Sequence, residues 1–207
     1  MKYKLIAFDF DGTLADSFPF FLEVCNTLAH AHGFARIDRG DLERLRGLDA
    51  RQMMKLVGLS PWKMPQVAVH FRALMAKNIH RISLFPGADR MLRRLAERGL
   101  ALAIVTSNSE ENVRAVLGPD SAALVAHFEC GVSLFGKRRK LRQLLARSGV
   151  RPAEALFIGD EVRDAEAAHG EGVDFGAVAW GYARLDALLA HSPEAIFTSL
   201  DEIGDLP

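Results

Sequence analysis

The sequence predicts an α/β fold in which a doubly wound parallel sheet forms the core and a small α-helical domain is inserted into it. Short apolar runs recur along the 207 residues, and each is too short and too uniformly apolar to form an amphipathic helix. Helical patterns alternate with the later runs, an order typical of doubly wound sheets. Roughly 85 residues between the first two runs show helical periodicity without a clear strand, far more than a strand-to-helix connection needs.

Taken in order, the elements divide the chain into a core and an insert. Strands are expected at residues 5–8, 100–105, 156–158, 175–179 and 195–197. Helices are expected near 18–32, 41–46, 50–57 and 64–80 in the insert, and at 88–98 and 137–148 in the core. We place the core domain at residues 1–14 and 86–207 and the helical domain at 15–85. Hinges are expected at 16–19 and 83–87, where Pro and Gly interrupt the pattern.

The composition indicates a globular chain with a small-molecule partner. Hydrophobic residues make up 49%, and Lys plus Arg and Asp plus Glu both number 26, so no net charge favours nucleic acid or an anionic membrane. Cys25 and Cys130 are the only cysteines and form no CxxC pair, as is usual in a reducing cytoplasm. The N-terminal run reaches Asp9 too soon for a signal peptide or a membrane span, so we expect a cytoplasmic location.

Polar residues follow three of the predicted strands directly. Period-2 geometry points the two acids after the first strand to the same side. In open α/β sheets the ligand binds beyond the carboxyl ends of the strands, so residues at these ends are expected to meet in one site. The residues concerned are Asp9 and Asp11 after the first strand, Thr106, Ser107 and Asn108 after the second, and Asp160 with Asp164 after the third.

The acids predict a magnesium site. Two carboxylates at one strand end repel each other and need a cation or a shared proton. Asp9 or Asp11 alone could be a turn or cap residue, but that interpretation does not explain why two acids follow the end of one apolar strand. With Asp160 and a hydroxyl at the same edge, the donors are hard oxygens, which suit Mg²⁺. The histidines are scattered and do not indicate zinc.

A phosphate site also needs a fixed positive charge, and Lys137 is the candidate. It opens a predicted helix just before the third strand, where a basic residue opposes the helix dipole and therefore calls for an anionic partner. Most charge runs are solvated faces, which is how we interpret the rest of the run 137–140. Lys140 lies one turn further on and stays an alternative.

Two of the candidates also have simpler structural explanations. Ser, Thr and Asn are common helix caps, but Ser109 can cap the helix that begins near Glu110, which leaves Thr106 available at its strand end. Asp164 can cap the next helix, bind the metal directly, or orient Lys137 by contacting its ammonium group without binding the metal. We give Asp164 a supporting role.

Together these motifs resemble the haloacid dehalogenase-like phosphohydrolase superfamily, over nearly the whole chain. A helical insert between the first two motifs is similar to the first cap class, as in phosphoglycolate phosphatases and their relatives. The resemblance implies a Rossmann-like core with residues 15–85 as its cap. The motifs that carry it are Asp9-Phe10-Asp11-Gly12-Thr13-Leu14, Thr106 after a strand, Lys137 before a helix, and Gly159-Asp160 with Asp164.

The resemblance implies separate roles for the acids. Asp9 would be the nucleophile that forms an aspartyl-phosphate, and Asp11 the general acid and base. Mg²⁺ would be held by the Asp9 carboxylate, the main-chain carbonyl of Asp11, and Asp160. Haloacid dehalogenases lack an acid at the position of Asp11 and phosphonatases carry a small residue there, so this residue favours phosphate esters.

The resemblance assigns phosphate binding to the remaining strand-end residues. Thr106 and Lys137, with Ser107 and Asn108, would bind phosphoryl oxygens and stabilise the charge of the transition state. Many relatives have proline after the motif lysine, whereas Arg138 follows here, so the choice between Lys137 and Lys140 stays open.

The residues that determine substrate specificity are expected in the insert, because the core contacts only the phosphoryl group. Its weak candidates are Arg46, Arg51, Lys55 and Trp62, each of which also fits a solvated or packing role. Near the far edge of the core, residues 180–182 (Trp-Gly-Tyr) resemble a loop of phosphoglycolate-phosphatase-like members, or simply pack at a strand end.

We therefore expect a Mg²⁺-dependent phosphomonoester hydrolase acting on a small phosphorylated metabolite, with 2-phosphoglycolate as the substrate that the resemblance suggests. The alternatives are a phosphomutase of the β-phosphoglucomutase kind and a receiver-type phospho-accepting signalling module. The expected partner is a small-molecule phosphate ester, with no nucleic acid and no membrane, and the chain is expected to be a monomer or a homodimer.

Overall fold

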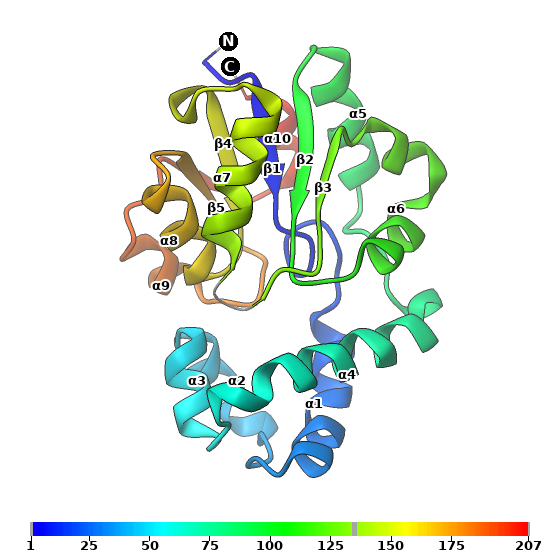
Figure 1. Cartoon of the computed structure of the whole chain (residues 1–207), viewed down its shortest axis with the longest axis vertical. Helices are drawn as coiled ribbons and strands as arrows, with labels where there is room; N and C mark the ends of the chain where they lie inside the picture. The colour runs from blue at the N-terminus through cyan, green and yellow to red at the C-terminus, as the bar shows by residue number, and fades with distance from the viewer. Residues whose placement is uncertain (1, 134–135, 207) are drawn as a thin grey trace.

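A six-stranded parallel sheet forms the centre of the protein (Figure 1). The computed structural model describes residues 2–133 and 136–206. The strand order is β3-β2-β1-β4-β5-β6, so the order reverses at β1, which pairs with both β2 and β4. The predicted doubly wound parallel fold is confirmed. The strands are β1 (Leu5–Phe8), β2 (Ala101–Val105), β3 (His127–Glu129), β4 (Ala155–Gly159), β5 (Asp174–Val178) and β6 (Ala195–Phe197).

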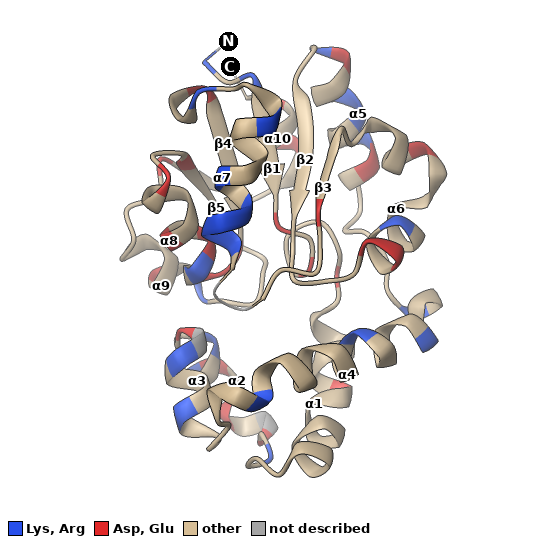
Figure 2. Ribbon diagram, viewed as in Figure 1, with Lys and Arg blue, Asp and Glu red and all other residues tan. Residues whose placement is uncertain are grey.

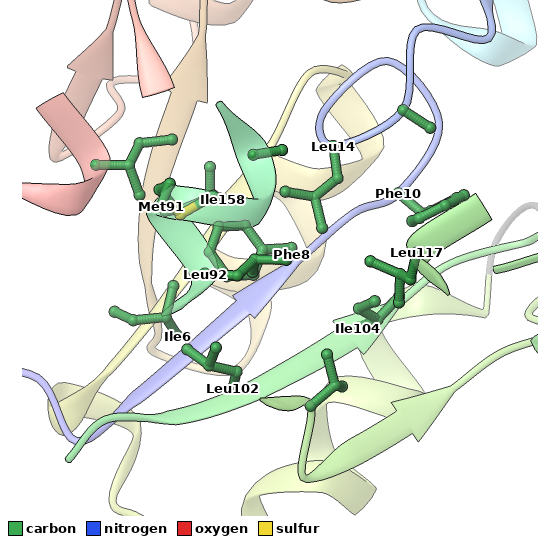
Figure 3. Close-up of a cluster of buried hydrophobic side chains, with 14 of the residues drawn as sticks. Ile6, Phe8, Phe10, Leu14, Met91, Leu92, Leu102, Ile104, Leu117 and Ile158 are labelled. Atoms are coloured by element: carbon green, nitrogen blue, oxygen red, sulfur yellow. The ribbon is translucent and has the colours of Figure 1, made fainter. Parts of the chain in front are cut away.

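Helices cover both faces of the sheet, and the alternation of side chains along β1 shows why. Ile6 and Phe8 point to one face, where they join a buried cluster with residues of α5, α6 and α10 (Figure 3). Leu5 and Ala7 point to the other face and join residues of α7, α8 and α9. The core helices are α5 (Ala88–Glu97), α6 (Glu110–Leu124), α7 (Lys137–Ser148), α8 (Val162–Gly170), α9 (Leu185–Leu189) and α10 (Leu200–Gly204).

The segment between β1 and α5 is helical and lies beyond the carboxyl ends of the strands (Figure 1). It has a small apolar cluster of its own, which includes Leu28 and Val67. Phe20 and Met75 instead join the large cluster on the first face of the sheet. Its helices are α1 (Phe18–His32), α2 (Leu42–Arg46), α3 (Ala50–Leu56) and α4 (Met64–Lys77), with short 3₁₀ turns at Arg39–Asp41, Pro61–Lys63 and Ile79–Arg81.

The two chain segments that enter and leave these helices run side by side. Ala15 and Leu84 form an antiparallel bridge, and the Phe85 N–H donates to the Leu14 carbonyl at 2.9 Å. Next to them, the Asp16 N–H donates to the Ser83 carbonyl at 2.9 Å. The expected hinges therefore meet at one place. The division into domains 1–14 with 86–207 and 15–85 stays a prediction, and we call residues 15–85 the cap below.

The structure adds one strand that the sequence pattern misses. β3 is three residues long and lies at the edge of the sheet, and only Glu129 in it is fully buried. A short, half-exposed edge strand carries no apolar run, so periodicity does not indicate it. Within the described residues, no helix is both long enough and apolar enough to cross a membrane.

Candidate active site

The loop after β1 turns sharply and is packed directly against the end of β4. The Asp9 N–H donates to the Ile158 carbonyl at 2.8 Å, which continues the sheet by one residue. Gly12 has a φ of 81°, and a Cβ there would lie 2.3 Å from Oδ2 of Asp160. Only glycine meets both demands, because other residues rarely adopt this φ and their Cβ would overlap the carboxylate.

Asp9 lies at the centre of a buried charge cluster. Its Oδ1 accepts from the Phe10 N–H at 2.7 Å, and its Oδ2 lies 2.5 Å from Nζ of Lys137. The same ammonium lies 2.5 Å from Oδ1 of Asp164, and all three charged side chains are at most 2% exposed. Burial opposes the charge on Lys137, but Asp164 and Asp9 outweigh it and raise its pKa above the ordinary value. Lys137 therefore stays an ammonium ion between two carboxylates.

The structure separates Lys137 from the other basic residues of α7, which are blue in Figure 2. Nζ of Lys140 lies 3.0 Å from the buried carboxylate of Glu129, so its partner differs from that of Lys137. Arg138 and Arg142 both pair with Glu171. Of the two lysines that the sequence left open, only Lys137 contacts Asp9.

Asp164 supports Lys137 with both of its oxygens engaged. Oδ1 contacts the ammonium, and Oδ2 accepts from the Glu161 N–H at 3.0 Å. The carboxylate thus caps the start of α8 and holds Lys137 at the same time. The two structural roles that the sequence offered for this residue coexist in the fold.

Asp160 is fully buried and held by two hydrogen bonds. Oδ1 accepts from the Thr13 hydroxyl and Oδ2 from the Tyr182 N–H, both at 2.7 Å. Burial, followed by the negative charge of Asp9, raises the pKa of Asp160 well above its usual range. An ionised carboxylate at this position therefore needs further positive charge.

The acids fit a divalent cation. Within the described part of the chain, Asp9, Asp160 and Asp164 each offer a carboxylate oxygen, and these atoms lie within 4.8 Å of one another. These three carboxylates are buried with one buried ammonium, which contacts Asp9 and Asp164, so the cluster holds more negative than positive charge. Hard oxygen donors with uncompensated charge suit Mg²⁺ better than softer metals.

Asp11 has surroundings unlike those of Asp9. Its Oδ2 accepts from Nδ2 of Asn108 at 3.0 Å, and it makes no salt bridge within the described residues. Burial, and then the charge of Asp9, raises the pKa of Asp11 from 3.8 to about 6. The carboxyl group of Asp11 therefore holds a proton at higher pH than a free aspartate does.

The loop after β2 contributes its residues unequally. Thr106 is fully buried, and its hydroxyl accepts from the Asn108 N–H at 3.1 Å, which still allows the hydroxyl to donate. Ser107 contacts the cap instead, since its carbonyl accepts from Nη1 of Arg72 at 3.1 Å. Ser109 caps α6 as expected, accepting from the Asn112 N–H.

The cap closes over this site from two sides. On one side, Arg72 and Met75 of α4 contact the loop after β2, with Sδ of Met75 2.9 Å from Nδ2 of Asn108. On the other, Arg46 of α2 donates to the carbonyls of Gly181 and Tyr182. Among the cap candidates from the sequence, Trp62 has 88% of its surface exposed.

Two further polar residues contact the site, although the sequence pattern assigns neither of them a role. Thr13 belongs to the first motif, and its hydroxyl contact with Asp160 could have been suspected from its place after the turn. Ser17 is fully buried, and its Oγ lies 2.9 Å from the Tyr182 hydroxyl. Nothing local marks Ser17, because its partner is 165 residues away in the sequence.

The buried acids lie where the strand order of the doubly wound sheet reverses, which is where such α/β folds bind their ligands. A family model described as haloacid dehalogenase-like hydrolase matches residues 6–178, and the chain belongs to this family. Relatives that are named phosphoglycolate phosphatase support a phosphatase within this family. This result does not support the receiver-type alternative.

Three relatives illustrate the range of the family. A phosphoglycolate phosphatase from Synechococcus elongatus is 37% identical over 192 residues, covering 92% of this chain and 91% of its own. The tyrosine-protein kinase PtkA of Mycobacterium tuberculosis is 30% identical, covering 88% of this chain and 64% of its own. The crystal structure of a putative phosphoglycolate phosphatase from Lactobacillus plantarum superimposes with a TM-score of 0.81 at 26% identity, covering 99% of each chain.

Proposed function

We propose that the protein is a Mg²⁺-dependent phosphomonoesterase that acts through an aspartyl-phosphate on Asp9. The observation that carries the proposal is the unequal pair of acids at the end of β1. Asp9 contacts a buried ammonium, whereas Asp11 is bound by an amide and has its pKa raised to about 6. The pair therefore supplies a nucleophile beside a buried ammonium and a proton carrier two residues away.

Asp9 suits the role of nucleophile because its carboxylate is held in one orientation. The Phe10 N–H fixes Oδ1, and Lys137 lies beside Oδ2. In the proposed first step, an oxygen of Asp9 attacks phosphorus and the bond from phosphorus to the ester oxygen breaks. Lys137 and Thr106 bind the equatorial phosphoryl oxygens as charge develops on them.

Asp11 carries the proton in both steps. With a pKa near 6, it is partly protonated close to neutral pH and donates its proton to the departing alkoxide. As a carboxylate it then removes a proton from the water that attacks the aspartyl-phosphate. Asn108, which donates to Oδ2 of Asp11, keeps the carboxyl group in place during both transfers.

Mg²⁺ would be held by the Asp9 carboxylate, the main-chain carbonyl of Asp11, and Asp160. When bound, it neutralises the repulsion between an anionic nucleophile and an anionic phosphate. Thr13 and the Tyr182 N–H orient Asp160 toward that task. Asp164 acts differently in this proposal, by holding Lys137.

The closed cap supports a small substrate. Phe18 and Phe21 of α1 pack around the Tyr182 ring, and their ring centroids lie 4.9 and 5.8 Å, respectively, from that of Tyr182. On the other side of the site, Met75 contacts Asn108. These apolar side chains exclude water from the aspartyl-phosphate until the leaving group departs. We propose 2-phosphoglycolate as the first substrate to test, on the strength of the 37% identical relative with that activity in its name.

A phosphate-release assay on a panel of small esters tests this function. The wild-type protein is expected to release phosphate with Mg²⁺ and to stop when a chelator is added. Asp9→Asn is expected to release almost none, and the exposed Asp16→Asn serves as the matched control that keeps full activity. Full activity of Asp9→Asn would show that the nucleophile is misassigned.

The same samples address the phosphomutase alternative. A mutase returns the phosphoryl group to a sugar, so a hexose phosphate would be isomerised with little free phosphate. Analysis of the sugar products after incubation separates the two reactions. Isomerised hexose phosphate as the main product would replace the hydrolase proposal by the mutase.

A further inference from the structure

One peptide group joins the cap to the carboxylate of Asp160. The carbonyl of Gly181 accepts from Nη2 of Arg46 at 2.9 Å, and the N–H of the same peptide group, that of Tyr182, donates to Oδ2 of Asp160 at 2.7 Å. The C=O and N–H of a trans peptide point in opposite directions. Arg46 on one side and Asp160 on the other therefore fix the orientation of a single peptide plane.

The contact of Arg46 with this loop is extensive. Its Nε donates to the Tyr182 carbonyl at 3.0 Å, so one guanidinium binds two successive carbonyls. Its own carbonyl accepts from the Arg184 N–H at 2.8 Å, and the guanidinium lies 5.6 Å from the centre of the Phe18 ring. Only 25% of the side chain is exposed. The planar guanidinium group has two donors spaced to bind both carbonyls at once, which a lysine ammonium cannot reproduce.

The loop at residues 180–182 packs closely against Asp160. A Cβ on Gly181 would lie 2.0 Å from Cβ of Asp160, so the backbone touches the side chain directly. The Tyr182 hydroxyl is 2.9 Å from Ser17, at the entry to the cap. Opening of the cap would separate α2 from this loop and release the two carbonyls that Arg46 binds.

We infer that Arg46 is a positioning residue that couples closure of the cap to the orientation of Asp160 through the Gly181–Tyr182 peptide group. Hydrogen bonds in a chain strengthen one another, so an arginine on the carbonyl makes the N–H a better donor to the carboxylate. Coupling of this kind is reciprocal: an ion bound at Asp160 favours the closed cap, and the closed cap favours the ion. The inference deepens the proposed function and rests on it for the identity of the ion.

The test measures Mg²⁺ binding by isothermal titration calorimetry without substrate, together with kcat and KM. Arg46→Met removes both hydrogen bonds to the loop, together with the surface pair with Glu43, whereas Arg46→Lys keeps the charge but loses the planar set of donors. Arg44→Met is the matched control, because Arg44 lies on the same helix, is 62% exposed and pairs only with Asp41 among the described residues. Circular dichroism verifies that each variant is folded.

We expect Arg46→Met to bind Mg²⁺ about ten-fold more weakly and to lose about ten-fold in kcat/KM, since hydrogen bonds from a charged donor are lost. Arg46→Lys is expected to show most of the same loss, and Arg44→Met to bind Mg²⁺ like the wild type. Unchanged Mg²⁺ affinity in a folded Arg46→Met protein would overturn the inference, as would an equal loss in Arg44→Met. If the wild type releases no phosphate from any ester, the proposed function fails while the calorimetric comparison still decides this inference.

Discussion

Replacement of Asp11 by asparagine is predicted to stabilise the metal-free protein at about pH 8 while removing its activity. Burial and the neighbouring Asp9 make the ionised form of Asp11 unfavourable, and these causes raise its pKa from 3.8 to about 6. Asparagine is neutral, has nearly the same shape, and keeps an oxygen for Asn108. The substitution therefore removes the free-energy cost of an ionised carboxylate at the residue that we propose carries the proton.

The size and pH range of the effect follow from the pKa. A rise of about two units corresponds to about 3 kcal/mol, at about 1.4 kcal/mol per unit. Asp11 is partly exposed, so solvent screening reduces this to about 2 kcal/mol. For an acid whose pKa is raised by folding, the native state holds the proton more tightly than the unfolded chain. Stability is therefore highest below about pH 4, falls as the pH rises to about 6, and stays lower above that.

Urea denaturation in the presence of a chelator measures this effect. We expect Asp11→Asn to raise the free energy of unfolding by about 2 kcal/mol at about pH 8, and by less than half as much at about pH 4.5. Asp16→Asn, an exposed change a few residues away, is the control and should do neither. A gain of equal size at both pH values, or a loss at about pH 8, would show that the raised pKa of Asp11 is not the cause of the change in stability.

Four further substitutions probe the rest of the site. Lys137→Met is expected to lower phosphate release about 100-fold or more and Lys140→Met less than about three-fold, so equal losses in the two variants would contradict the assignment. Asp164→Asn is expected to lower kcat about ten-fold by loosening Lys137, and an unchanged kcat would exclude that role. Gly181→Ala is expected to lower the free energy of unfolding in urea by about 3 kcal/mol, because its Cβ would overlap Asp160; wild-type stability would contradict the packing.

The sequence predicts the sheet well because its buried strands are uniformly apolar. The run that ends at Phe8 and the insert helix at residues 18–32 appear at the predicted bounds. The edge strand His127–Glu129 could not be predicted, since it is short and half-exposed. Parallel pairing to β2, a long-range contact, forms this strand rather than any local pattern.

The acids of the site were predictable because strand ends of a doubly wound sheet meet at one edge. The choice between Lys137 and Lys140 could not be predicted, because both lysines lie on one helix. They are distinguished only by their partners in the folded chain, which are Asp164 for Lys137 and Glu129 for Lys140. The contact of Arg46 with Gly181 was also beyond reach, since it joins residues 135 positions apart. Local sequence thus indicates which chemistry is present, and packing decides which of several like residues takes part.

In the proposed mechanism, Asp9 carries the phosphoryl group during turnover. Mass spectrometry of protein quenched with acid during reaction with its best ester tests this directly, after borohydride reduction of any acyl-phosphate. The peptide containing Asp9 is expected to be phosphorylated in the wild type, converted by borohydride at Asp9, and unmodified in Asp9→Asn. Steady phosphate release with no modified Asp9 peptide, or the same modification in Asp9→Asn, would show that Asp9 is not the nucleophile.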